Sequence, residues 1–209
     1  AAPVVRGQVL ISEFMAANDG TLLDEDGDSS DWIEVWNATG AAVDLAGYFL
    51  TDDAAAPGKW AFPAVTLAPN EARVVFASVK DRRDPAANLH TNFALEKSGE
   101  YLALTKSDGN GGFDVVSAFA PLYPPQDQDV SYGSSDAEGY TGFMEVPTPG
   151  AHNAVTYAGF VADTNFTDSA TGLPRLRGRY SAPFNLAIAT STPGALIRSN
   201  TNGSTPQRP

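Results

Sequence analysis

The chain has 209 residues, of which 43% are hydrophobic, enough for a substantial core, and only 18% are charged. Its 25 acidic and 13 basic side chains give a formal net charge of −12, which argues against binding to nucleic-acid phosphates or insertion at an anionic membrane surface. The absence of cysteine excludes disulfides and thiolate chemistry, and no apolar run approaches the roughly 20 residues of a membrane-spanning helix.

The N-terminal part of the predicted fold is two strands joined by a polar loop. Residues 9–15 are predicted to form the first strand and residues 32–37 the second, with the loop over residues 18–31 between them. Alternation in the second strand places Ile33 and Val35 on one face and the two tryptophans on the other. Large side chains on both faces indicate that both are covered, at least in part.

The chain up to about residue 153 shows further short strands separated by turns rich in glycine and proline. We predict them over residues 43–50, 60–63, 65–67, 73–79, 90–95, 100–105, 113–119 and 130–133. The turn around Pro69 predicts a hairpin between the strands on either side of it, and the glycine-rich turn at 107–112 predicts another. No segment longer than about ten residues has a helical period with caps. The pattern therefore predicts an all-β antiparallel sandwich or barrel.

Beyond about residue 155 the density of charge falls. Two strands are predicted there, over residues 184–188 and 194–198, and two strands alone cannot bury much surface. We therefore predict three parts in the chain. They are a β-sandwich over residues 1–154, a linker or irregular start of the next module over 155–178, and a truncated β segment over 179–209.

The loop before the second strand is the best candidate site. Five carboxylates lie within eight residues of it, with no lysine or arginine between them. They belong to Asp24, Glu25, Asp26, Asp28 and Asp31. Like charges at this spacing repel one another, and a hard cation with several oxygen ligands would turn that repulsion into binding.

The spacing of these acids around Gly27 is typical of flexible calcium loops, although the glycine comes too early for an EF-hand. We therefore predict a Ca²⁺ site in this loop. Its predicted ligands are Asp24, Asp26, Asp28, Asp31 and Glu34. The alternative is a solvated acidic loop in which an aspartate only caps a turn.

Aromatic side chains offer a second candidate site. Trp60 stands beside Lys59 in a short strand and is the tryptophan expected to be exposed, so it is the candidate for ligand binding by stacking on a sugar. The alternative is that Trp60 belongs to the core, like most aromatic residues of a sandwich.

The sequence shows no catalytic motif. His90 and His152 lie in separate segments, and the chain lacks a Gly-x-Ser-x-Gly elbow, a His-Glu-x-x-His zinc motif and the glycine motifs that bind phosphate. With 25 acids some carboxylate pairs arise by number alone, so they do not indicate sugar hydrolysis. We predict that the chain is not an enzyme, although composition leaves a Ser-His-Asp triad open.

Four stretches resemble the lamin-tail domain family in its bacterial form. They are Ile-Ser-Glu-Phe-Met at 11–15, Asp-Trp-Ile-Glu-Val-Trp-Asn at 31–37, Val-Asp-Leu-Ala-Gly-Tyr-Phe-Leu-Thr-Asp at 43–52 and Gly-Glu-Tyr-Leu-Ala-Leu at 99–104. The closing Pro-Thr-Pro-Gly-Ala-His-Asn at 147–153 also looks like the end of those domains. The resemblance covers roughly residues 7–153 and implies an immunoglobulin-like antiparallel β-sandwich, with a partial second β module after it.

The tail, over about residues 157–209, is similar to the small chitobiase/hexosaminidase C-terminal-type β domain. The similarity is carried by Tyr-Ser-Ala-Pro-Phe at 180–184, Thr-Pro-Gly-Ala-Leu-Ile-Arg at 192–198 and Thr-Asn-Gly-Ser-Thr-Pro at 201–206. Together the two resemblances imply an accessory piece of a large bacterial secreted or surface protein, with any catalysis elsewhere in the polypeptide.

The expected function is therefore a non-catalytic extracellular or cell-surface module that binds a protein or a surface polysaccharide. Calcium is expected to stiffen its acidic loop, and neighbouring domains of the same polypeptide are expected partners. The alternative is a carbohydrate-binding accessory module. Neither nucleic acid nor membrane insertion is expected.

Overall fold

The structure is a computed structural model that describes residues 8–134, 141–153, 156–161, 163–197 and 199, so the tail motif at 201–206 lies outside the described residues. All regular structure in the described part is β-strand. The strands are β1 (Val9–Met15), β2 (Asp31–Asn37), β3 (Val43–Asp44), β4 (Tyr48–Thr51), β5 (Trp60–Ala61), β6 (Thr66–Leu67), β7 (Ala72–Ala77), β8 (Leu89–His90), β9 (Leu102–Ser107), β10 (Phe113–Phe119), β11 (Ser131–Ser134), β12 (Thr141–Met144), β13 (Asn165–Asp168) and β14 (Leu186–Ala189). The chain divides into two compact units, Ala1–Ala158 and Gly159–Pro209.

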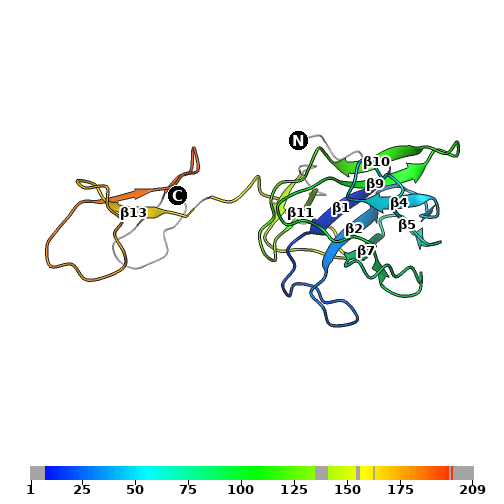
Figure 1. The fold of residues 1–209 in the computed structure, drawn as a ribbon, viewed down its shortest axis with the longest axis horizontal. Helices are drawn as coiled ribbons and strands as arrows, with labels where there is room; N and C mark the ends of the chain where they lie inside the picture. The colour runs from blue at the N-terminus through cyan, green and yellow to red at the C-terminus, as the bar shows by residue number, and fades with distance from the viewer. Residues whose placement is uncertain (1–7, 135–140, 154–155, 162, 198, 200–209) are drawn as a thin grey trace. The chain divides into compact units, whose positions relative to one another are not determined.

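The first unit is a β-sandwich with two main sheets (Figure 1). One sheet has six strands in the order β12-β11-β1-β2-β7-β8, and the other has four in the order β10-β9-β4-β5. A short pair, β3 with β6, accompanies them. Among the described strands, β7 and β8 pair in parallel and the other pairings are antiparallel. The prediction of an all-β antiparallel sandwich is confirmed.

β1 and β2, at the centre of the six-stranded sheet, are buried on both faces. Ile33 and Val35 pack in the main core between the sheets. Trp32 lies on the opposite face, in a smaller cluster with Met15 and Phe76. The predicted alternation in β2 is therefore confirmed, and the second cluster explains why both faces of this strand carry large apolar residues.

The predicted hairpin around Pro69 is wrong, whereas the hairpin at 107–112 is confirmed by the direct pairing of β9 with β10. β6 pairs with β3 and β7 pairs with β2, so the strands on either side of Pro69 join different partners. The side chain of Asn37 accounts for the difference. Its amide donates to the carbonyls of Leu67 (3.0 Å) and Ala68 (3.0 Å), which holds the end of β6 beside the end of β2.

The second unit contains one antiparallel pair in its described residues, β13 with β14. β14 overlaps the strand predicted over 184–188, but β13 lies in the stretch predicted to be irregular. The strand predicted over 194–198 is not formed at its described residues 194–197. A turn takes up the start of this stretch. In it the N–H of Ala195 donates to the carbonyl of Thr192 (3.3 Å), because the Pro-Gly sequence favours a reversal over an extended chain.

Candidate functional site

The loop between β1 and β2 folds on itself around the side chain of Asn18. The amide of Asn18 donates to the carbonyls of Leu22 (2.6 Å) and Ser30 (2.8 Å), and its oxygen accepts the N–H of Thr21 (3.0 Å). An asparagine that bonds to nearby backbone groups in this way stabilises a compact loop. These hydrogen bonds therefore fix the conformation of the loop where its acidic half begins.

Asp24 organises that acidic half. Its side chain is fully buried and accepts the N–H groups of Asp26 (3.0 Å) and Asp28 (3.1 Å) and the hydroxyl of Ser30 (2.8 Å). Gly27 has φ 82°, a left-handed conformation that glycine adopts without a steric penalty, and this lets the chain reverse. As a result one carboxylate oxygen from each of Asp24, Asp26 and Asp28 lies within 4.8 Å of the others.

The ammonium group of Lys80 lies among these three carboxylates. Its Nζ is 2.6 Å from Asp24, 2.7 Å from Asp26 and 2.8 Å from Asp28. Lys80 follows β7 and stands 56 residues after Asp24 in the chain. In this structure, the positive charge that the sequence led us to assign to a metal ion is supplied by a lysine from a distant segment.

Arg82 neutralises the outer part of the same loop. Its guanidinium donates to Glu25 (2.5 Å) and to Asp26 (2.6 Å). Glu25 also accepts the amide of Asn88 (3.0 Å) and lies 3.0 Å from Nε2 of His90. We call Lys80, Arg82, Asn88 and His90 with the acids they contact the loop network. It fastens the acidic loop to the segments that follow β7.

The loop network lowers the pKa of the acids that it holds. Burial by itself raises the pKa of Asp24, but hydrogen bonds, first among them the one from Lys80, outweigh it and leave the pKa well below its usual range. The pKa of Glu25 falls to about 2, chiefly because it accepts the amide of Asn88, against an opposing contribution from burial. Both carboxyls are therefore ionised at neutral pH.

Asp31, a predicted calcium ligand, lies at the base of the loop and apart from the other three aspartates. One of its oxygens accepts the N–H of Asn18 (3.0 Å). Burial raises the pKa of Asp31 to about 6, the bond from Asn18 opposes that rise, and the nearby charge of Glu100 adds to it. The structure thus gives Asp31 a role in fixing the start of the loop.

Glu34, the fifth predicted ligand, lies inside β2 and contacts a different part of the chain. It is buried, and its carboxylate accepts the hydroxyl of Ser12 (2.5 Å) and the N–H of Gly150 (2.6 Å). Glu13, its partner across the bulge in β1, is also buried and accepts the N–H (3.0 Å) and the hydroxyl (3.0 Å) of Thr148. Two buried carboxylates from adjacent strands therefore bind one short stretch near the end of the first unit.

We call residues 147–153 the closing segment. Asn153 completes its attachment, because its amide donates to the carbonyls of Ser12 (2.8 Å) and Ser134 (2.8 Å). The sequence indicated this motif but not its partners. The signal that could have found them is a glutamate in the middle of each of two strongly apolar strands, since a buried carboxylate needs hydrogen-bond donors.

The prediction that Trp60 is exposed is wrong. Its side chain is completely buried and packs edge-on against Phe62, with ring centroids 4.9 Å apart. Because β5 pairs with β4, this short strand is drawn into the four-stranded sheet and its tryptophan into the core. The other two tryptophans, Trp32 and Trp36, are buried as well, so no tryptophan offers a face for sugar stacking.

The structure also brings together a serine, a histidine and an acid that no sequence motif indicated. Ser78 Oγ lies 2.7 Å from Nδ1 of His90, whose Nε2 lies 3.0 Å from Glu25. Catalysis needs an imidazole that a substrate can approach. The ring of His90 is completely buried and stacks on Phe76, with centroids 5.2 Å apart. The arrangement therefore bridges the loop network to β7 and keeps the imidazole away from solvent.

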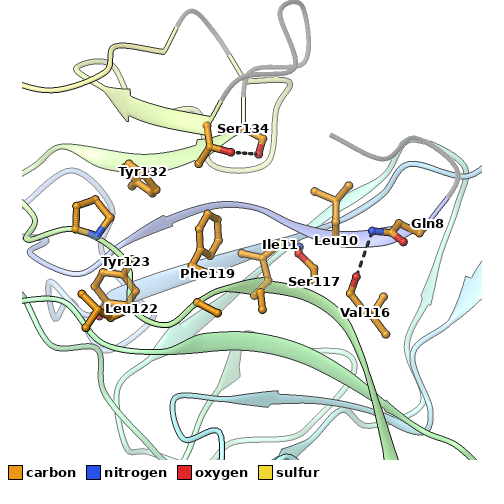
Figure 2. Close-up of a pocket in the computed structure, with 14 residues that line it drawn as sticks. Gln8, Leu10, Ile11, Val116, Ser117, Phe119, Leu122, Tyr123, Tyr132 and Ser134 are labelled. Atoms are coloured by element: carbon orange, nitrogen blue, oxygen red, sulfur yellow. Dashed lines mark hydrogen bonds between the residues drawn. The ribbon is translucent and has the colours of Figure 1, made fainter. Parts of the chain in front are cut away.

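A cavity of about 400 Å³ lies between β1, β10 and β11 (Figure 2). Apolar and aromatic side chains line it together with a few polar ones, among them Leu10, Phe119, Leu122, Tyr132, Ser134 and Thr141. Its volume lies in the range of sites that hold small molecules or side chains of a partner. Nothing in the sequence pattern indicated this cavity.

Comparison with known families assigns the first unit. A model of the Lamin Tail Domain matches residues 3–119, more than half of the chain. The chain belongs to this family. Neither the curated proteins nor the solved structures contain a match. The lamin tail domain match ends at the last residue of β10, yet β11 pairs with β1 in the same sheet, so the folded unit extends beyond the matched residues.

The lamin tail domain is an immunoglobulin-like sandwich, which agrees with the two-sheet architecture of the first unit. The described residues include no helix with the length and apolarity required to span a membrane.

Proposed function

We propose that the chain is a non-catalytic interaction module that works outside the cell, as an accessory part of a larger bacterial secreted or surface protein. Membership of the lamin tail domain family supports the proposal, because immunoglobulin-like sandwiches commonly present binding surfaces on a rigid scaffold. The strongly acidic composition without cysteine is consistent with it. The partner we propose is a protein, with a surface polysaccharide as the alternative.

The observation that carries the proposal is the use of the buried polar side chains. Glu13 and Glu34 bind the closing segment, and His90 bridges Ser78 and Glu25. Enzymes keep such groups in a cleft where substrate can reach them. Here each is engaged by the scaffold, which supports a role in binding and not in catalysis.

Two measurements test this proposal. A panel of ester, peptide and glycoside substrates should show no turnover by the native chain, and a Ser78→Ala variant should be indistinguishable from it. Turnover that Ser78→Ala abolishes would contradict the non-catalytic assignment. Arrays of polypeptides and of glycans then distinguish the two classes of partner, and we expect binding on the polypeptide array.

The second candidate function, carbohydrate binding, is favoured by one feature of the second unit. Phe166, Tyr180 and Phe184 line a cavity of about 320 Å³ there. The rings of Tyr180 and Phe184 are 4.8 Å apart, and the guanidinium carbon of Arg175 lies 4.6 Å from the centroid of Phe184. Exposed aromatic rings beside a cation can stack on a sugar and contact its polar groups.

A glycan array with three proteins decides between the candidates. Tyr180→Ala removes an aromatic ring of this cavity. Leu196→Ala is the control: it truncates another side chain of the second unit, one that is 75% exposed. Glycan binding by the native chain that Tyr180→Ala removes and Leu196→Ala retains would favour carbohydrate. If none of the three proteins binds a glycan, the result favours a protein as the partner.

We propose Ca²⁺ as a competing occupant of the acidic loop. The converging oxygens of Asp24, Asp26 and Asp28 are ligands that Ca²⁺ accepts, but Lys80 lies among them, so an ion would have to displace the ammonium group. Lys80→Met separates the two, because removal of the competing charge should raise calcium affinity. Isothermal titration calorimetry with Ca²⁺ measures the affinity of the native chain and of the Lys80→Met variant. If neither shows heat of binding, Ca²⁺ is not an occupant of the loop.

We further propose that the second unit is a β module of the chitobiase/hexosaminidase C-terminal type. The sequence resemblance and the pair β13–β14 support this. Large apolar side chains are exposed in the unit, among them Leu176 at 82%, which leaves surface for a neighbouring domain of the same polypeptide. Limited proteolysis tests the point: cleavage within residues 159–209 should be slower in a longer product of the gene than in this chain.

A further inference from the structure

β10 is the longest strand at the end of a sheet in the described part of the molecule. It has seven residues and pairs only with β9, whereas β5 and β8, at two other sheet ends, have two residues each. The fourth end strand of the two main sheets, β12, exchanges two backbone hydrogen bonds with Tyr157, both of 2.8 Å. β10 therefore has the longest run of edge backbone groups without a neighbouring strand.

β10 also lacks most features that protect a free edge. Its seven residues, Phe-Asp-Val-Val-Ser-Ala-Phe, include one charged side chain and neither lysine nor proline. Val115 is 60% exposed and Phe113 is 40% exposed. A bulge between Val115 and Ser117 is the protective irregularity that remains. An edge with this composition is a template for another strand.

A second strand edge faces the same cavity. β11 pairs with β1 at residues 13–14, so among the described strands the first half of β1 has β2 on one side and no neighbour on the other. There the N–H of Ile11 donates to the hydroxyl of Ser117 (3.2 Å), and the carbonyl of Val116 accepts the amide of Gln8 (3.2 Å). Figure 2 shows the bond between Gln8 and Val116. The side chains of Gln8 and Ser117 thus occupy the positions at which the backbone of an added strand would make its hydrogen bonds.

We propose that this cavity receives an extended segment of a partner protein, whose backbone pairs with the edges of β1 and β10. The inference rests on the proposed interaction function and names its site. The segment would replace the bonds made by Gln8 and Ser117 with backbone hydrogen bonds. Leu10, Phe119 and Tyr132 line a space for its aliphatic side chains.

Charge indicates the composition of the segment. All but two of the 25 acidic residues and all but five of the 13 basic residues precede residue 159, so the first unit is strongly anionic. A segment with lysine or arginine on either side of valine and threonine is therefore favoured, and an acidic one is repelled. The same repulsion disfavours a second copy of this chain as the occupant.

The test titrates the full chain with a short peptide of alternating valine and threonine between terminal lysines. The matched peptide has terminal glutamates. We expect saturable binding of the lysine peptide, about tenfold tighter than that of the glutamate peptide at low salt. Backbone amide shifts in nuclear magnetic resonance spectra should concentrate in residues 8–11 and in β10.

Three variants locate the site. Leu122 is 56% exposed and lines the cavity, so Leu122→Lys should weaken binding about tenfold. Val146 is 71% exposed and does not line it, so Val146→Lys should leave binding unchanged. Ser117→Ala frees the N–H of Ile11 for the peptide and should tighten binding about threefold. Removal of a serine with only a structural role would not tighten binding. Melting curves show whether each variant is folded.

Equal weakening by both lysine variants, or amide shifts confined to other strands, would overturn the site while leaving the interaction function in place. Self-association of the chain in a sedimentation experiment, or an absence of binding by both peptides, would overturn the site as well. Failure of the proposed function would appear separately, as turnover in the substrate panel.

Discussion

The ammonium group of Lys80 lies 2.6 Å from the buried carboxylate of Asp24, although 56 residues separate the two in the chain. The contact connects the loop between β1 and β2 with the segment after β7, and β2 and β7 are neighbours in the six-stranded sheet. The acidic side chains of this loop would repel one another if unpaired, but ion pairs attach the loop to the sandwich.

Lys80→Met should lower the free energy of unfolding by about 1–3 kcal/mol, because the buried carboxylate of Asp24 would lose its cation. Urea denaturation measures the change. Lys97→Met, at an exposed lysine, is the matched control and should have little effect. Equal stability of the two variants would show that the loop network does not support the fold.

Asp31 should make the protein less stable as the pH rises from about 4 to about 6. Its pKa is about 6 in the folded chain against an ordinary value of 3.8, so the folded state binds the proton more tightly in that interval. The resulting cost is complete above pH 6. Glu25 acts in the opposite direction, because its pKa of about 2 makes stability fall only as the pH drops below about 4.

Asp31→Asn keeps an oxygen acceptor for the N–H of Asn18 but removes the titration. We expect the variant to gain about 1–2 kcal/mol at pH 7, a value that allows for the partial exposure of the side chain, and little near pH 4. Urea denaturation at both pH values measures the difference. A gain of the same size at both would contradict the assignment of the titration to Asp31.

Glu34→Ala should destabilise the first unit by about 2–4 kcal/mol, because the hydroxyl of Ser12 and the N–H of Gly150 would lose a buried acceptor. Thermal melting measures the change, with Glu145→Ala at an exposed position as control. If the two variants melt alike, the closing segment is not part of the cooperative fold. The same reasoning predicts that a chain ending at residue 146 is less stable, although the family match ends at residue 119.

Trp60→Ala should cost about 3–5 kcal/mol, as expected when a large buried ring is deleted from a core. Trp60→Phe should cost less, since it keeps the contact with Phe62. Denaturation curves measure both. A Trp60→Ala variant of native stability would instead mean that the ring is not part of the core, and would restore the expectation of a surface role.

The fold could be predicted from the sequence where the pattern is local. Alternation in β2 placed Ile33 and Val35 correctly, and the glycines between β9 and β10 identified their hairpin. Where the partner is distant the prediction failed. The residues around Pro69 predict the turn itself, but the strands on either side of it separate because Asn37 binds the backbone of one of them. No local sequence pattern indicates that contact.

The same limit applied to the candidate site. The acids of the loop could be identified as a cluster in need of a cation, but Lys80 and Arg82 come from beyond β7, so their role depends on strand order. Nearness in sequence groups Glu34 with the cluster, whereas its carboxylate, inside β2, binds the closing segment. Trp60 is predicted at the surface because it stands beside Lys59 in a short strand. The strand that forms has two residues, which are too few to show an alternation of buried and exposed side chains.

The attachment of the closing segment has a mechanical consequence. Tension on the end of the first unit would meet the pair of hydrogen bonds between Tyr157 and β12 first. Beyond that pair it would reach Asn153 and pass through the carbonyl of Ser12 into β1, close to where the described chain begins. The load path between the two ends would then be short, and most strands would lie outside it. A module loaded in this way could transmit pull between neighbouring domains while the four-stranded sheet stays in register.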